Sequence, residues 1–404
     1  MSDRTRKMVK FGGLESARWL RSEIQYRLAG TGAKKHRKIW RIAMISDRDA
    51  WCSDQQLNPF DEFRSRLLED FGISFQQIYL DGLGRFPPLP LGLFDIVMVK
   101  LSYRTDAARA VKIVTDLKKE IGSTPLVYMD GDDDICVQWG DVVTACDLYV
   151  KEHAFADRSK YKIAFQGKSN LHEYAITHHG HVLSGDDYSR PDQEPLIIHH
   201  SGVVRDEDLG KIVVGWNMAL AKDILELWRK VRGQPPVEKK IDCAFRGSVK
   251  LNTITGYMRR DASAHLENLS KRFNIRVSAS HVPLDEYYKE LMESRICVSP
   301  FGFGELCWRD FEAVLCRSML IKPDMSHIET SPNIFHPHIT YIPVKWDLSD
   351  LEEVCAYYLD HEEKRREIAE NAYSVLDNYY SSFGFGDDLS KILSLACPAF
   401  SGGR

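Results

Sequence analysis

The segment Ile296–His327 holds the densest set of residues that could carry out chemistry in this chain. A short apolar run ends at Ser299 and Pro300, Gly302 and Gly304 follow, and a helical pattern then begins. Glycines let a backbone approach a phosphate group closely, and the first turn of a helix presents free N–H groups and the positive end of its dipole. The spacing therefore predicts a phosphate-binding loop.

Charged side chains cluster around this loop. Glu305 and Glu312 are suited to accept hydrogen bonds from the hydroxyls of a ribose, and Arg309 and Asp310 lie between them. His327, which follows the next apolar run, is expected close to the same site. The alternative is a plain strand–turn–helix in which the glycines serve only the turn and the acids cap the helix.

Two cations close predicted strands in the same half of the chain. Arg246, followed by Gly247, ends the run 241–245, and Lys322 ends the run 319–322. Two fixed positive charges can neutralise a diphosphate without a metal ion. The alternative for Arg246 is an ion pair with a surface acid.

An acidic turn, Asp130–Asp134, follows the predicted strand Pro125–Met129. Asp132 and Asp134 form an Asp-x-Asp pair, and carboxylates are hard ligands that suit Mg²⁺ or Mn²⁺. Such short acidic patterns are common by chance, and a solvated turn with a capping Asp130 is the alternative. We expect no metal site here.

The elements that must position these residues alternate between strand-like and helix-like. The strands are expected at 39–46, 74–80, 94–101, 125–129, 148–150, 241–245, 275–279, 296–300, 319–322 and 340–344. The helices are expected at 60–70, 106–121, 218–231, 263–273, 284–294, 308–317, 348–359, 362–379 and 387–396. This alternation predicts two mostly parallel α/β sheets of similar size, with the ligand between them at the carboxyl ends of the strands.

The run SPFGFGELCWRDFEAVLCRSMLIKPDMSH resembles the C-terminal half of glycosyltransferases with two Rossmann-like domains, the GT-B architecture. It is most similar to bacterial exostosin-like and CgeB-like transferases, and the likeness covers roughly residues 240–380 well. Many retaining members carry two glutamates separated by seven residues, whereas Glu305 and Glu312 have six between them. Glu312 is thus the better match to the ribose-binding position, and the stereochemical class stays open.

The resemblance implies the transfer of a sugar from a nucleotide-sugar donor to a hydroxyl of a glycan or glycolipid, in cell-surface polysaccharide assembly. The donor residues implied are Arg246, Gly247, Ser299, Gly302, Gly304, Glu305, Arg309, Glu312, Lys322 and His327. Asp132, with Asp130 and Asp133 beside it, is the expected catalytic base on the acceptor side. No cofactor is expected. The rival interpretations are a nucleotide-sugar epimerase and a non-catalytic carbohydrate- or partner-binding protein.

This interpretation divides the chain into four parts. Residues 1–38 form a basic amphipathic extension, 39–208 an acceptor-binding domain, 209–380 a nucleotide-sugar-binding domain, and 381–404 a crossover helix and tail. His178, His179 and His181 lack a fourth zinc ligand at a diagnostic spacing, and they are expected to touch the acceptor sugar or solvent.

The composition bounds the remaining choices. Among 404 residues, 44 % are hydrophobic and 28 % are charged, which excludes disorder for the chain as a whole. No apolar run approaches the roughly 20 residues of a membrane span, and no apolar signal core follows the N-terminus. Nine cysteines without a Cys-x-x-Cys pair indicate reduced thiols in a cytoplasmic protein.

The net charge of −4 hides a basic N-terminus. Residues 1–41 carry twelve Lys or Arg and three acids, with an apolar stripe from Leu14 to Leu28 at helical spacing. Such a helix can lie on the anionic inner face of a membrane, or its stripe can pack on the folded body. The remainder is acidic and carries no nucleic-acid recognition module, so nucleic acid is not an expected partner.

Overall fold

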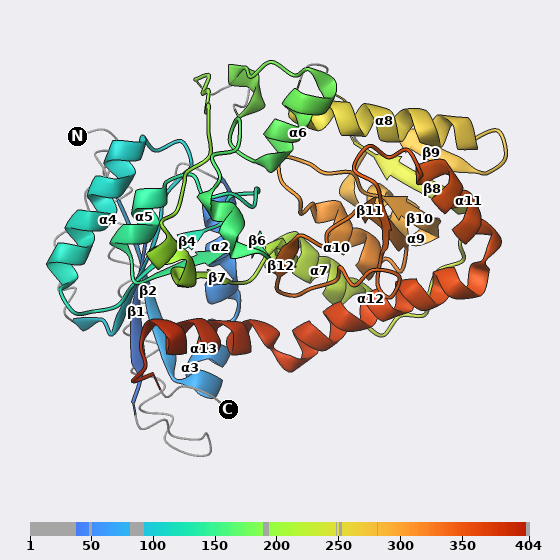
Figure 1. The fold of residues 1–404 in the computed structure, drawn as a ribbon. Coiled ribbons are helices and arrows are strands. Elements are labelled where there is room, and N and C mark those ends of the chain that lie inside the picture. The colour runs from blue at the N-terminus through green and yellow to red at the C-terminus, as the bar shows by residue number, and fades with distance from the viewer. Residues whose placement is uncertain are drawn as a thin grey trace, which may run out of the picture.

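The computed structural model describes most of the chain. The described residues are 38–47, 51–80, 93–188, 194–247, 249, 253–280 and 282–400. The predicted basic extension, residues 1–38, lies outside them except for its last residue. The described chain forms two α/β halves, which stand side by side in Figure 1.

The first half is built on a sheet of six parallel strands in the order β2-β1-β3-β4-β5-β7. These strands are β1 (Trp40–Ser46), β2 (Ile73–Tyr79), β3 (Ile96–Lys100), β4 (Leu126–Asp130), β5 (Leu148–Lys151) and β7 (Ile212–Val214). Strands β3 and β4 are buried along their full length, as in parallel sheets with both faces covered. Their sequences therefore read as continuous apolar runs.

Helices join these strands. They are α2 (Trp51–Glu62), α3 (Arg64–Phe71), α4 (Ala107–Ile121), α5 (Gly140–Ala145) and α6 (Asn170–His179). Helix α4 begins where the Asp106 carboxylate accepts a hydrogen bond from the Arg109 backbone N–H at 3.0 Å. It buries Ala110, Val114 and Leu117, whose spacing of three and four places them on one face.

The second half contains a sheet of five parallel strands in the order β13-β11-β10-β8-β9. These strands are β8 (Ile241–Arg246), β9 (Ile275–Ser278), β10 (Ser294–Val298), β11 (Met319–Pro323) and β13 (Ile342–Val344). The helices of this half are α7 (Lys222–Val231), α8 (Ile254–Leu269), α9 (Leu284–Glu293), α10 (Trp308–Leu315), α11 (Leu351–Asp360) and α12 (Glu362–Ser382).

Both sheets place their first strand between the second and the third. In the first sheet β1 lies between β2 and β3, and in the second sheet β8 lies between β9 and β10. At the first strand of each sheet, the chain stops adding strands on one side and adds the next on the other; we call this place the winding reversal. The two connections there cover opposite faces of the sheet, which opens a crevice at the carboxyl ends of the strands. The ends of β1 and β3, and those of β8 and β10, are therefore where ligands are expected.

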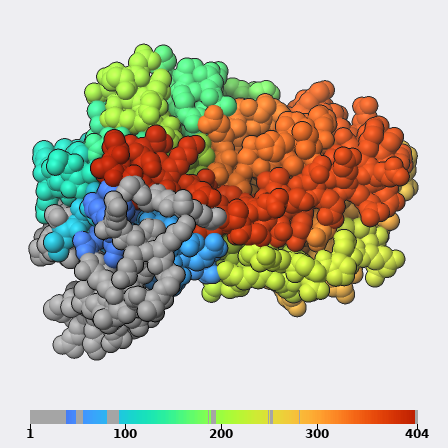
Figure 2. All heavy atoms as spheres, turned by 90° about the horizontal axis from the view of Figure 1, so that it is seen from below, coloured from blue at the N-terminus to red at the C-terminus, as the bar shows by residue number. Residues whose placement is uncertain are grey.

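Two features join the halves. Strand β6 (His153–Phe155) pairs antiparallel with β12 (Ile328–Thr330), and these strands come from opposite halves. Helix α13 (Gly384–Ala396) returns to the first half, where it contacts α3 and β5. In Figure 2 the C-terminal part of the chain runs across both halves.

Helix α13 is fixed by aromatic packing. The ring of Phe385 lies edge-on to Phe60 of α2 at 5.5 Å and to Trp216 at 5.0 Å. All three side chains are buried, so the return of the chain is part of the hydrophobic core rather than a surface contact. The predicted fold class, two facing Rossmann-like domains with a C-terminal helix that crosses back, is confirmed.

The structure differs from the sequence-based expectation at several elements, among them α6, which no predicted helix covers. Helix α8 begins at Ile254, nine residues before the predicted start, and α2 begins at Trp51 rather than near residue 60. The predicted starts relied on apolar periodicity, which is weak in the first turns of both helices. The short strands β6 and β12 were not predicted, because three residues are too few to show a period.

Candidate active site at the facing sheet edges

The glycine loop lies at the winding reversal of the second sheet, directly after β10. The Gly302 N–H donates to the Gly304 carbonyl at 3.1 Å, which closes the loop on itself. A methyl group on Gly302 would lie 3.7 Å from Nη2 of Arg259, so a guanidinium from α8 faces the loop. A glycine loop beside a cation at this edge suits a phosphate group.

Asp310 holds the start of α10 together and takes up the charge of Lys322. Its carboxylate accepts from the Cys307 N–H at 2.9 Å and the Ser299 hydroxyl at 2.5 Å. Lys322 Nζ lies 3.0 Å from the same carboxylate, and both side chains are fully buried. The Lys322 ammonium, predicted to face the donor, thus neutralises Asp310 in this structure. Ser299 is likewise buried under the loop.

Arg246, the other cation predicted to bind the diphosphate, is paired with an acid. Its guanidinium makes a two-pronged ion pair with Glu290 of α9, at 2.8 and 2.7 Å. The pairing corresponds to the alternative given above, an ion pair with an acid. Arg246 is the last residue of β8, and its side chain reaches α9.

Arg309 occupies the position expected for Arg246. From α10 it reaches the end of β8, where Nη2 donates to the Arg246 carbonyl at 2.5 Å beside Gly247. Its Nε is buried and has no hydrogen-bond partner among the described residues. The pKa of Arg259 is lowered by burial, and the nearby Arg309 guanidinium contributes. Two guanidiniums near the glycine loop thus favour an anion.

Glu312 lies on α10, where it accepts a hydrogen bond from the Tyr287 hydroxyl at 2.9 Å. The Tyr288 hydroxyl lies 3.5 Å from its other oxygen. Burial raises the pKa of Glu312, although both hydroxyls oppose this shift. The two hydroxyl groups thus hold the Glu312 carboxylate in one orientation at the carboxyl edge of the second sheet.

The acidic turn follows β4 at the carboxyl edge of the first sheet. Asp130 is buried, and its carboxylate accepts from Lys151 Nζ at 2.8 Å and from the Tyr149 hydroxyl at 2.7 Å. Burial raises the pKa of Asp130, but Lys151 outweighs it and the net shift is downward. A carboxylate that already accepts two hydrogen bonds and has a lowered pKa is a poor proton acceptor. We therefore infer that Asp130 stabilises the conformation of the turn.

Lys168 lies beside both carboxylates of the Asp-x-Asp pair. Its Nζ is 2.6 Å from Asp134 and 3.4 Å from Asp132. The ammonium supplies the positive charge that a divalent cation would bring. Among the described residues, no cluster of three His, Cys, Asp or Glu side chains has the arrangement of a metal site.

The two sheet edges touch at the glycine loop. A methyl group on Gly304 would lie 1.4 Å from the carbonyl oxygen of Asp133, so only glycine allows this approach. The next residue, Glu305, is fully buried. Its carboxylate lies 3.1 Å from His153 Nε2 and accepts from the Asn170 amide at 3.0 Å. The predicted donor residues Gly304 and Glu305 therefore form the contact between the halves.

His327 lies beside Glu305. Its Nε2 is 3.8 Å from the Glu305 carboxylate, and its ring stands near Trp346 at 5.3 Å. Burial acts to raise the pKa of Glu305, but the hydrogen bond with His153 and the nearby His327 imidazole outweigh it and the pKa is lowered. Glu305 is therefore ionised, and the two imidazoles lie next to a fixed negative charge.

Sequence reasoning missed three polar residues at the first sheet edge. Glu152 directly follows β5, is buried, and its Oε2 has no hydrogen-bond partner among the described residues. Burial raises its pKa well above the usual value, with Asp133 adding to the shift. Gln56 of α2 is buried with both amide atoms lacking a partner in the described chain, and Lys100 ends β3 nearby. The one signal for these residues in the sequence was Lys100, a lysine at the end of an apolar strand.

The histidine cluster joins helices of opposite halves. The His179 ring stacks on Tyr257 of α8 at 4.8 Å, and His181 Nε2 lies 3.0 Å from the Asp187 carboxylate. His178 packs on Tyr174 of its own helix. These contacts explain the sequence pattern as an interface between α6 and α8.

A comparison with family profiles finds a match in the second half of the chain. Residues 250–382 match the profile of the family described as Glycosyl transferase-like. No curated protein matches the chain significantly. Among solved structures, similar ones include an alpha-glucosyltransferase in complex with UDP and DNA, with 11 % identity, 87 % of this chain and 99 % of that chain covered, and a TM-score of 0.47.

Two bacterial structures are similar to the same degree. The alpha,alpha-trehalose-phosphate synthase (UDP-forming) of Burkholderia vietnamiensis has 10 % identity, 90 % and 99 % coverage of this chain and of that chain, and a TM-score of 0.46. A glycosyltransferase from Rickettsia africae ESF-5 has 10 % identity, 90 % and 100 % coverage, and a TM-score of 0.46. At these values the likeness carries no conclusion about substrates.

The structure thus contains two Rossmann-like sheets, and residues 250–382 of its second half match the Glycosyl transferase-like family. The matched segment runs from α8 through α12 and contains the glycine loop, Arg309 and Glu312. No helix in the described ranges has the length and apolar character that a membrane span requires.

Proposed function

We propose that the protein transfers a sugar from a nucleotide-sugar donor to a hydroxyl of a glycan or glycolipid in cell-surface polysaccharide assembly. The observation that supports this best is the pair of guanidiniums, Arg259 and Arg309, near the glycine loop at the winding reversal of the second sheet. The acceptor side is the polar edge of the first sheet. The site of action is the cytoplasm, at the inner face of a membrane.

In this proposal the second sheet edge binds the donor. Arg309 and Arg259 offset the charge of the diphosphate, which grows as the bond to the sugar breaks. The backbone of the Gly302 loop lies against the phosphates, and Glu312 accepts hydrogen bonds from the ribose. No metal ion or other cofactor is required, because the side chains already supply two positive charges.

The first sheet edge binds the acceptor and removes its proton. The acceptor oxygen attacks the anomeric carbon, the bond from that carbon to the diphosphate oxygen breaks, and the hydroxyl proton passes to a carboxylate. Asp132 and Asp133 are the acids of the turn that keep some exposure, and the Asp132 side chain, 12 % exposed, lies 3.4 Å from Lys168. We assign Asp132 as the base, with Asp133 beside it as a support of the turn.

Thermal unfolding of the full chain with UDP, GDP, ADP and CMP, first in chelator and then with Mn²⁺ in place of the chelator, tests the donor site. A ligand at about 100 times its dissociation constant stabilises the native state by about 2.7 kcal/mol, which raises the Tm by several degrees. One nucleotide is expected to do so. If none of the four nucleotides raises the Tm, with or without Mn²⁺, the result favours a non-catalytic binding protein.

Turnover is then measured with the sugar form of the active nucleotide. Release of the nucleoside diphosphate that requires an added glycan or glycolipid acceptor supports transfer. Conversion of the donor without any acceptor would instead identify an epimerase. An Arg309→Gln variant that keeps its fold is the matched control, since it should release no product under either condition.

A further inference from the structure

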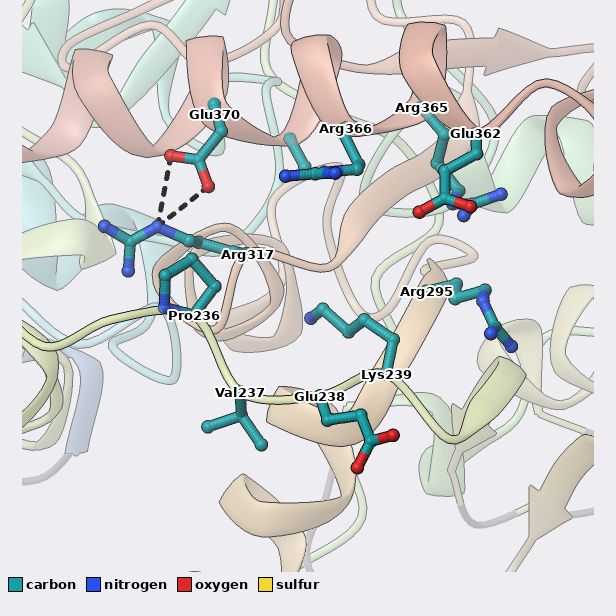
Figure 3. Close-up of a pocket in the computed structure, with 11 residues that line it drawn as sticks. Pro236, Val237, Glu238, Lys239, Arg295, Arg317, Glu362, Arg365, Arg366 and Glu370 are labelled. Carbon is teal, nitrogen blue, oxygen red and sulfur yellow. Dashed lines mark hydrogen bonds and ion pairs between the residues drawn. The ribbon is translucent and has the colours of Figure 1, made fainter.

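A cavity of about 340 Å³ opens at the amino ends of β8, β10 and β11, at the opposite edge of the second sheet from the glycine loop (Figure 3). Its walls come from the loop before β8, the turn after α10 and the first turns of α12. The lining residues with charged side chains are Glu238, Lys239, Arg295, Arg317, Glu362, Arg365, Arg366 and Glu370. Five of these are cations and three are acids.

The acids do not neutralise all of this positive charge. Glu370 is taken by Arg317, whose Nε lies 3.0 Å from its carboxylate. Arg295 pairs with Asp242 outside the cavity. Arg365 is buried, and its Nη1 donates to the Tyr358 carbonyl at 2.8 Å, so its guanidinium is fixed in place.

Lys239 and Arg366 remain without a carboxylate partner in the described part of the chain. Lys239 Nζ donates to the Cys316 carbonyl at 3.1 Å, and Arg366 makes no ion pair with any described residue. Figure 3 shows the two side chains entering the cavity from opposite walls, Lys239 from the segment before β8 and Arg366 from α12. Two like charges face one another across a concave space.

Other cations of the cavity act on Lys239. Burial lowers the pKa of Lys239 to about 8, and the nearby Arg317 guanidinium adds to that shift. An anion between Lys239 and Arg366 would supply acceptors for several N–H groups at once. Guanidinium and ammonium groups in such a set match the oxygens of a phosphate, with each contact a charge-assisted hydrogen bond.

We propose that this cavity is a binding site for a small phosphate-bearing anion, held by Lys239 and Arg366. The volume lies at the lower end of the range for small-molecule sites, which fits a molecule of sugar-phosphate size. The site stands at the amino ends of the strands, whereas the donor site stands at their carboxyl ends. Its ligand therefore binds without competing for the donor loop, and the proposal does not depend on the transferase reaction.

Calorimetric titration of the full chain with inorganic phosphate and with glucose 6-phosphate, at constant ionic strength, tests the site. Wild type is expected to bind at least one of them. Lys239→Met and Arg366→Gln should each weaken binding by about tenfold or more, the loss expected for one charge-assisted contact. Lys240→Met is the matched control, because that neighbouring ammonium is exposed and pairs with Glu293. A control that loses as much affinity as Lys239→Met would overturn the proposal.

A second set of titrations separates other sources of the signal. If phosphate binding survives in Lys239→Met and disappears in Arg309→Gln, the anion sits in the donor loop and the proposal is wrong. Vesicles with anionic phospholipid that bind wild type, when neither soluble phosphate does, would assign the patch to a membrane instead. Arg366 is exposed, so its variant carries the test if Lys239→Met does not fold.

Discussion

The carboxylate of Glu305 accepts a hydrogen bond from the Asn170 amide at 3.0 Å, and this bond joins the two halves of the molecule. Glu305 follows the glycine loop of the second sheet, whereas Asn170 begins α6 of the first half. His153 lies 3.1 Å from the second oxygen of the same carboxylate. The loop that is proposed to bind the donor is thus anchored to the proposed acceptor side through one buried negative charge.

Removing this charge should loosen the halves. Glu305→Ala leaves the buried His153 Nε2 and the half-buried Asn170 amide without their acceptor, and we expect a loss of about 3 kcal/mol of unfolding free energy. Glu305→Gln keeps an acceptor for Asn170 and should recover part of that loss. Urea unfolding measures both. Glu329→Gln is the control, because that exposed pair with Arg158 should cost less than about 1 kcal/mol.

Gly304→Ala should separate the sheet edges. The added methyl would lie 1.4 Å from the Asp133 carbonyl oxygen, so the loop or the acidic turn must move. We expect turnover to fall by at least about a hundredfold, because misplacement by about 1 Å has that effect on reacting groups. Gly210→Ala is the control, since a methyl there meets nothing within 4 Å. Equal activity of the two variants would contradict the assigned contact.

Arg309 should matter more for nucleotide affinity than Arg246. Arg309→Gln removes a cation beside Gly247, and we expect the affinity for the active nucleoside diphosphate to fall by about tenfold or more. Arg246→Gln removes a cation that is already paired with Glu290, and it should change affinity by less than about threefold. Calorimetry decides between them; a larger effect of Arg246→Gln would restore the role first predicted for that residue.

Asp132 and Glu152 can be told apart by turnover and pH. Asp132→Asn should lower kcat by about a hundredfold or more with little change in KM, as expected when a general base is lost. Glu152→Gln should act less on kcat if Glu152 only supports the turn. Burial raises the pKa of Glu152, so a kcat that rises with pH above neutrality and loses this dependence in Glu152→Gln would make Glu152 the base instead.

His172 should make the protein sensitive to acid. Burial lowers the pKa of this imidazole from 6.5 to about 3, so the unfolded chain binds its proton first as the pH falls. Stability is therefore lost below pH 6.5, by about 2 kcal/mol between pH 7 and pH 5 from this group. His172→Gln should flatten that part of the stability curve. An unchanged slope in urea unfolding would show that other groups dominate.

Much of the fold could be predicted because parallel strands are buried on both faces. The apolar runs Phe94–Leu101 and Ile296–Pro300 predict strands without knowledge of the neighbouring strands. In the helix at 106–121, the spacing of the apolar residues predicts which face is buried. The glycine loop was equally visible. Its residue types and its place after a strand follow from the local sequence alone.

The roles of the cations could not be predicted in this way. Arg246 and Lys322 both end strands, yet in the structure Arg246 pairs with Glu290 of α9 and Lys322 pairs with Asp310 of α10. Arg309, inside a helix, reaches the site instead. Which cation faces a ligand depends on side-chain directions from three elements at once, and no local pattern encodes that.

The sequence by itself determined the two α/β halves, the loop at Gly302 and Gly304, and the acidic turn, because each depends on residues that are neighbours in the chain. Only the tertiary structure decided that Gly304 touches Asp133 and that Glu305 bonds to Asn170. Those contacts join positions more than a hundred residues apart. They form because the paired strands β6 and β12 and the returning helix α13 fix how the two sheets face each other.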